Sequence, residues 1–264
     1  MFASTQWTTR LQALIDYFCV TLKQPKTFYT KGSAPMTDVR NMPAYTPGDA
    51  ARYLHIPIST VRCWCFGQAY KDSEGKDKYL PPVITPVDKL NKLLSFTNLV
   101  ELHVLSLTRR EYKVPMPIVR NTINFLRKEL RVERPLAEQQ LFTDRMDLFV
   151  EQMGAYMSAS GSRQLQPHEI VHGYLERIER DKLGAPLKLF PLVRSLKDDP
   201  QQAPVIEIDP AIAFGRPVLA HTGIPVASLV QRWQAGESIA SLAADYEQPA
   251  DVIEEVVRTS LRAA

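Results

Sequence analysis

The pattern of apolar and polar residues from 46 to 66 predicts two short helices joined by a tight turn. In each half, apolar side chains recur at helical spacing, and only about three residues separate the halves. Thr46 and Pro47 provide a helix start signal, and His55 at the end of the first helix is a residue type that tolerates a positive φ. The positions expected to face inward are Ala50, Ala51, Leu54, Val61, Trp64 and Cys65. This arrangement is typical of a helix-turn-helix.

Polar side chains occupy the outer face of the second of these helices. In a helix-turn-helix that binds DNA, this face enters the major groove. Arg62 can donate two hydrogen bonds to the edge of a guanine, and Ser59 and Thr60 near the helix start suit phosphate groups. Exposed arginines are also common on ordinary protein surfaces, so a plain packing role for the helix pair is the alternative.

A charged hairpin and two leucine-rich helices are expected to follow the helix pair. Residues 67–85 place a polar run around Gly75 between two apolar stretches, which predicts a β-hairpin. Its lysines, Lys71, Lys76 and Lys78, would lie along the DNA backbone as a wing. Leucines at helical spacing, among them Leu90 and Leu94, predict helix within 85–110, and a second helix is expected within 117–133.

The second half of the chain has a different character. Short strands are expected in 139–160, a helix in 167–181 and a strand in 186–193, followed by one or two strands and three helices near 225–235, 237–245 and 248–262. The predicted fold is mainly α (α+β). It comprises an extension and linker (1–44), a winged helix-turn-helix (45–133), a mixed connecting region (134–203) and a C-terminal helical domain (204–264) with short strands before its helices.

Composition narrows the protein class without deciding the function. The 264 residues are 45% hydrophobic and 23% charged, which is ordinary for a globular chain, and the net charge of +3 permits nucleic-acid binding without indicating it. Three cysteines are too few for a disulfide framework. The apolar run near the N-terminus is interrupted by Arg10 and Asp16, so we expect a cytoplasmic protein without a membrane segment.

Sequence motifs of catalysis are missing from the chain. It has no glycine-rich phosphate loop, nucleophile signature or HExxH pair, so we expect no catalytic residue, no cofactor and no enzymatic activity. His168 and His172 are spaced to share one helix face, with Glu169 or Glu176 nearby, but a third metal ligand is not recognisable. We therefore expect no metal site.

Residues 45–66, with the hairpin and helices after them, resemble the winged-helix head of MerR-like regulators and excisionases. The resemblance is carried by Ala-Ala-x-x-Leu and Thr-Val-Arg-x-Trp in this order and covers about residues 45–130. It implies DNA binding through a helix-turn-helix and a wing. The usual Arg-Tyr of the wing is absent, and only Tyr79 stands in a comparable place.

Residues 206–245 resemble a short domain of unknown function found in VapB-type antitoxins. The matching positions are Ile206, Pro210, Gly215, Arg216, Pro217, Val218, Thr222, Ile224, Pro225, Val226, Gly236, Glu237, Ser238 and Ile239. The chain departs from the pattern at His221, where the family usually has Gly, and at Gly223, where it usually has Arg. Together, the two domains resemble long VapB-type antitoxins, which implies repression of their own operon and neutralisation of a partner toxin, expected to be a PIN-like ribonuclease.

A small helical C-terminal core leaves apolar surface for a partner, so we also expect a homodimer. The candidate partner or dimer interface consists of Arg216, Pro217, Ile224, Pro225, Leu229 and Trp233. The alternative function is a stand-alone MerR-like transcriptional regulator that senses a small ligand through its middle region. Toxin binding predicts that residues 134–264 recognise a protein, whereas the sensor predicts a ligand pocket there.

Overall fold

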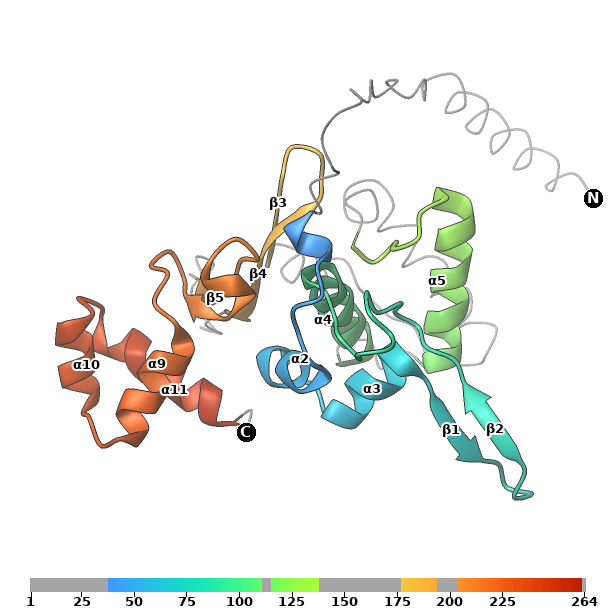
Figure 1. The fold of residues 1–264 in the computed structure, drawn as a ribbon, viewed down its shortest axis with the longest axis horizontal. Helices are drawn as coiled ribbons and strands as arrows, with labels where there is room; N and C mark the ends of the chain where they lie inside the picture. The colour runs from blue at the N-terminus through green and yellow to red at the C-terminus, as the bar shows by residue number, and fades with distance from the viewer. Residues whose placement is uncertain (1–37, 111–114, 138–176, 194–203, 263–264) are drawn as a thin grey trace, which may run out of the picture. The chain divides into compact units, whose positions relative to one another are not determined.

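The computed structural model describes residues 38–110, 115–137, 177–193 and 204–262. Both helices and short antiparallel strands occur along these residues, so the fold is mixed α+β (Figure 1). Within these four ranges, no helix is long and apolar enough to cross a membrane.

The helix pair consists of α2 (Pro47–Leu54) and α3 (Ile58–Phe66), preceded by the short 3-10 helix η1 (Val39–Asn41). A capping box starts α2: Thr46 Oγ1 accepts the Asp49 N–H at 3.1 Å, and the Asp49 carboxylate accepts the Thr46 N–H at 3.0 Å. The helix ends at His55, whose φ of 53° is left-handed. The predicted helices and the positive φ at the turn are therefore confirmed.

The inward sides of α2 and α3 pack into one hydrophobic core. All of the positions expected to face inward are buried except Ala51, which is half-buried against that core. Val61 is completely buried on α3, as is Ala50 on α2. Burial of this apolar surface stabilises the packing of α3 against α2 and so fixes the orientation of α3.

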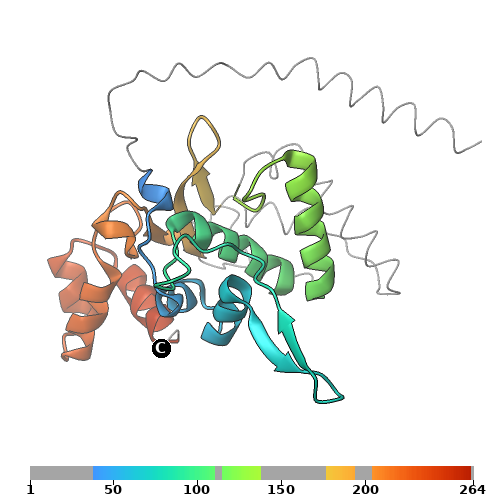
Figure 2. The same ribbon diagram turned by 45° about the vertical axis from the view of Figure 1, so that its right-hand side comes forward.

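A two-stranded hairpin, β1 (Gln68–Lys71) and β2 (Asp77–Leu80), extends from the end of α3 (Figures 1 and 2). Asp72 organises its turn, because one carboxylate oxygen accepts the backbone N–H groups of Glu74 and Lys76, both at 3.0 Å. Gly75 lies at the tip with a φ of 78°. The expected hairpin and its tip are confirmed.

The segment before the next helix differs from the prediction. Residues 88–93 form a tight turn closed by two backbone hydrogen bonds between Asp88 and Leu93, and Leu90 is 94% exposed. The prediction of a helix over residues 88–93 was therefore wrong. Proline at 81, 82 and 86 removes helical N–H donors, and the Asp88 carboxylate accepts the Asn91 N–H at 3.0 Å, which stabilises a turn. The helices that follow are α4 (Phe96–Arg110) and α5 (Met116–Leu130).

A four-stranded antiparallel sheet has the order β3 (Ile178–Arg180), β4 (Pro186–Val193), β5 (Pro204–Ile208) and β6 (Val218–Leu219). The strand predicted over 186–193 is confirmed as β4. Residues 178–180 were predicted as helix but form a strand, since they pair with β4 across a turn in which Gly184 has a φ of 84°. The strands predicted in 139–160, and most of the helix predicted in 167–181, lie outside the described residues.

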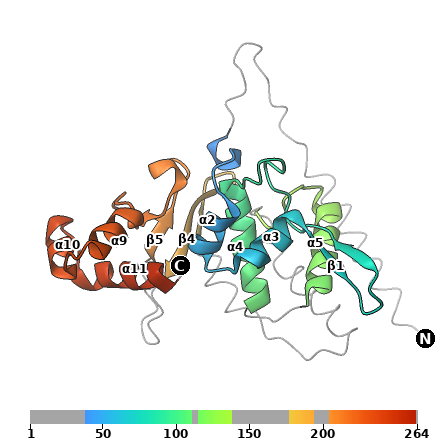
Figure 3. The same ribbon diagram turned by 60° about the horizontal axis from the view of Figure 1, so that its bottom comes forward.

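Three helices end the chain: α9 (Val226–Gln234), α10 (Ile239–Asp245) and α11 (Ala250–Arg262) (Figure 3). They fall within the predicted ranges and share a second core with β5 and β6. Leu229, Leu242 and Ile253 are completely buried in it. Between β5 and β6, the 3-10 turn η2 (Ala213–Gly215) carries the chain back to the sheet.

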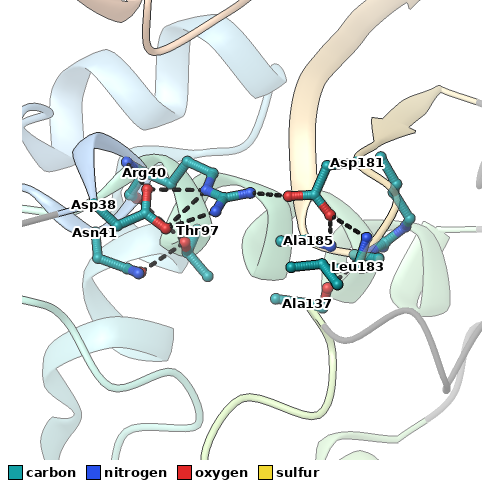
Figure 4. A network of polar contacts seen from close by, with 10 residues as sticks. Asp38, Arg40, Asn41, Thr97, Ala137, Asp181, Leu183 and Ala185 are labelled. Atoms are coloured by element: carbon teal, nitrogen blue, oxygen red, sulfur yellow. Dashed lines mark hydrogen bonds and ion pairs between the residues drawn. The ribbon is translucent and has the colours of Figure 1, made fainter. Parts of the chain in front are cut away.

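Polar contacts around Arg40 connect the segment before α2 with the β3–β4 hairpin (Figure 4). Its guanidinium forms 2.7 Å ion pairs with Asp38 and with Asp181 at the hairpin turn. Thr97 on α4 donates to Asn41 Oδ1 at 2.8 Å. The Arg40 guanidinium and the backbone N–H groups of the turn hold the pKa of the Asp181 carboxyl below its usual value.

We expect the variant Asp181→Asn to remove a pH-dependent part of the stability. Because the folded-state pKa is lowered, the carboxylate stabilises the fold above its ordinary pKa, and this contribution is lost as the pH falls through the lowered value. Urea midpoints of the parent and the variant should differ most near neutral pH and converge as the pH falls below the lowered pKa of Asp181. The control is Glu129→Gln, at an exposed position on α5. A difference independent of pH would contradict this assignment.

Candidate nucleic-acid interface

The outer face of α3 presents the side chains expected to contact DNA. Ser59 and Arg62 are exposed, and Thr60 is half-buried. Among the described residues, no carboxylate pairs with Arg62, so its guanidinium can donate to an external acceptor. Arg52 on α2 differs, because it forms a 2.7 Å ion pair with Asp49 and lies over the Tyr53 ring.

The lysines of the hairpin are exposed, but acidic neighbours surround them. Lys76 forms a 2.6 Å ion pair with Glu74, and Lys78 lies 3.7 Å from Asp72. Lys71 is directly opposite Asp77 in the strand register. Residues 45–80 contain five Lys and Arg side chains against four Asp and Glu. The hairpin therefore attracts phosphate less strongly than its lysines alone suggest.

Tyr79 fixes the base of the hairpin against α3. Its hydroxyl donates to the Phe66 carbonyl at 3.0 Å, and it lies over Gly67, whose φ is 79°. A Cβ at position 67 would lie 2.2 Å from the Tyr79 hydroxyl oxygen. The tyrosine expected from the wing motif therefore contacts the protein itself. The roles of Gly67 and Asp72 were not predicted, although an Asp at the start of a turn is a residue type that favours the turn.

A buried carboxyl lies behind α3 on the neighbouring helix α4. Glu101 is 2% exposed and accepts a 2.9 Å hydrogen bond from Asn98 Nδ2. Burial raises the pKa of the Glu101 carboxyl to about 7, against the opposing effects of Arg134 and Asn98. Burial also raises the pKa of the Cys65 thiol on α3, with a contribution from Glu101. Sequence reasoning missed Glu101, because its burial depends on elements distant along the chain.

The candidate partner residues in the C-terminal half occupy different environments. Arg216 and Pro225 are exposed, Pro217 and Ile224 are half-buried, and Trp233 is 37% exposed. Leu229 is completely buried, so its side chain supports α9 from within and is not available to a partner.

Phe214 was not among the predicted interface residues, yet it is 93% exposed. It has a φ of 56°, and Ala213 before it is also left-handed. Two consecutive non-glycine residues in this region are costly, by about 1–2 kcal/mol each. The cost is a reason to look for function at this turn.

Within the described residues, no group of three His, Cys, Asp or Glu side chains could hold a metal ion. His168 and His172 lie outside those residues, as does most of the segment on which the ligand-sensor alternative depends.

Two regions of the chain match known family models. Residues 43–123 match a family described as "Putative DNA-binding HTH domain", and residues 206–257 match "Protein of unknown function (DUF433)". The first match spans the α2–α3 pair, the β1–β2 hairpin, α4 and part of α5. The second begins in β5 and ends in α11.

A curated relative covers most of the chain. The protein described as "Putative antitoxin VapB45", from Mycobacterium tuberculosis (strain ATCC 25618 / H37Rv), is 28% identical in an alignment 224 residues long that covers 78% of this chain and 89% of the relative. The crystal structure of Rv2018 from Mycobacterium tuberculosis matches with a TM-score of 0.58 at 24% identity, covering 83% of this chain and 97% of that one. This second likeness concerns the fold alone.

Substitution of Gly67 should disrupt the base of the hairpin. Ala at this position must adopt a left-handed φ and also clashes with Tyr79 and the Leu80 carbonyl. Gly75→Ala is the matched control, because its φ of 78° is nearly the same but nothing lies within 4 Å of the added Cβ. We expect about 1 kcal/mol of destabilisation for Gly75→Ala and an additional ~1–3 kcal/mol for Gly67→Ala in urea unfolding. Equal losses of unfolding free energy in the two variants would show that Tyr79 moves aside without destabilising the fold.

Glu101→Gln should flatten the pH dependence of stability. Because the folded-state pKa is raised, the folded protein binds this proton more tightly than the unfolded chain, and stability falls as the pH rises from the ordinary value of 4.5 through about 7. Between about pH 5 and 8, the parent should lose ~1–3 kcal/mol relative to the variant. Parallel stability curves from urea unfolding at several pH values would contradict this.

Proposed function

We propose that this protein is the antitoxin of a type II toxin-antitoxin system, which binds its own operator DNA and neutralises a PIN-like ribonuclease. In this proposal, α2, α3 and the β1–β2 hairpin act as a MerR-like winged helix-turn-helix, and the protein is a cytoplasmic homodimeric repressor. It has no catalytic activity of its own. The observation that carries the proposal is the exposed outer face of α3 on a firmly packed helix pair, with an Arg62 that no carboxylate of the described residues pairs with.

Support for the antitoxin part comes from the second half of the chain. The family match over residues 206–257 begins in β5 and ends in α11, and the relative described as "Putative antitoxin VapB45" is aligned with 78% of this chain. We therefore assign operator reading to the N-terminal helix pair and toxin binding to the C-terminal domain.

Growth of a host that expresses the open reading frame adjacent to this gene tests the antitoxin part. The adjacent product should arrest growth, and this chain supplied in trans should relieve the arrest. Arrest that this chain cannot relieve would refute the antitoxin assignment, and so would the absence of arrest.

Arg62→Ala should relax the sequence preference of operator binding. A bidentate contact of Arg with guanine is worth about 1–3 kcal/mol of discrimination, so the ranking of single-base operator variants should collapse at one position. The matched control is Arg52→Ala on α2, where the guanidinium is held by Asp49 and Tyr53. Binding isotherms over an operator library, at fixed salt, measure both. An unchanged ranking for Arg62→Ala would remove α3 as the recognition helix.

A further inference from the structure

The chain contains a second helix pair built to the same plan as α2–α3. With a constant offset of 192 residues, Ser238 takes the position of Thr46, and Pro249 takes that of Pro57. Ser238 Oγ accepts the Ser241 N–H at 3.1 Å, the same bond and length as between Thr46 and the Asp49 N–H. Both first helices, α2 and α10, therefore begin with a hydroxyl cap.

The turns of the two pairs share a left-handed residue and the backbone hydrogen bond that follows it. His55 and Glu247 are both left-handed, with φ of 53° and 54°. After each, one backbone N–H bonds back five residues: Ile56 to the Ala51 carbonyl at 3.0 Å, and Gln248 to the Ala243 carbonyl at 2.9 Å. The proline that precedes each second helix accepts hydrogen bonds from the residues three and four positions later.

The buried faces complete the correspondence. The inward residues of α3 and their equivalents in α11 are each buried: Val61 and Ile253, Trp64 and Val256, Cys65 and Val257. α11 therefore has the position in its pair that α3 has in the first. The side chains that α3 presents outward have counterparts on the exposed side of α11.

The exposed side chains of α11 differ in charge from those of α3. Asp251 and Glu254 of α11 take the positions of Ser59 and Arg62, and both are exposed. The exposed row continues through Arg258, which pairs with Glu254, to Leu261. Residues 204–264 carry four Arg and no Lys, against eight Asp and Glu, whereas the chain as a whole has a net charge of +3. Phosphate is repelled by such a domain, and a cationic surface is attracted.

We infer that α10–α11 is a second helix-turn-helix whose outer face on α11, the row Asp251, Glu254, Arg258 and Leu261, docks on a basic surface of a partner protein and not on DNA. This inference rests on the proposed function, because the partner it names is the toxin. A ribonuclease needs a cationic surface for its substrate, and the acidic side of the row is complementary to such a surface. Leu261, which is 38% exposed, adds an apolar contact at the end of the row.

The test uses the full chain and the purified product of the adjacent open reading frame. In Asp251→Asn/Glu254→Gln, both side chains keep their size and lose their charge. We expect affinity for the adjacent product to fall about tenfold at low salt, chiefly through a slower association rate, and the salt dependence to become shallower. The matched control is Glu129→Gln/Glu133→Gln, which removes two exposed carboxylates elsewhere and should leave binding unchanged.

The outcomes separate this inference from the proposed function. If the parent protein binds the adjacent product and the α11 variant binds it equally well, the inference is overturned and the antitoxin function stands. If the parent does not bind the product, both are overturned. Operator binding is measured in parallel and should keep its sequence ranking in the α11 variant. A ranking altered as in Arg62→Ala would mean that the second pair reads DNA, and would overturn the inference.

Discussion

Burial of the helix α4 from Phe96 to Ser106 is the constraint on which the position of α3 depends. From Leu94 to Ser106 every residue is buried, and α2, η1 and β4 all pack against this helix. Polar side chains in such a helix need hydrogen-bond partners. Asn98 supplies several, because its amide oxygen accepts from the backbone of Val87 and Ser95, and its Nδ2 donates to Thr85 and Glu101. The loop before α4 and the helix itself are thus held in one arrangement.

This arrangement is relevant to recognition because a helix that reads bases has to be positioned within a fraction of an ångström. α3 lies against the same core as α4, with Cys65 near Glu101. The hairpin adds a second support at this same C-terminal end of α3, through Tyr79 and Gly67. Neither support requires the outer face of α3, so Ser59 and Arg62 are left for a ligand.

Local signals in the sequence predicted most of the elements, whereas contacts between distant residues did not follow from it. The Thr46 cap and the left-handed His55 depend on neighbours within a few residues, and both are present. The strand predicted over 186–193 is present as well, where it pairs with β3 and β5. Leucine spacing at 87–94 failed because prolines and Asp88 favour a turn. In the candidate site, the outward position of Arg62 on α3 could be predicted from helical spacing. The burial of Glu101 arises from packing between elements that are distant along the chain, which no local pattern encodes.

The geometry around Gly215 explains why the C-terminal motif has a glycine at this position. Gly215 has a φ of 74°, and a Cβ there would lie 2.1 Å from the Tyr45 hydroxyl oxygen. Only glycine fits both conditions, so the turn that exposes Phe214 is fixed by a contact with Tyr45, which precedes the N-cap of α2. The two helix pairs make a related point. Caps, turn conformation and buried stripes agree between them, so these features specify the scaffold, while the exposed residues of α3 and α11 are free to differ in charge.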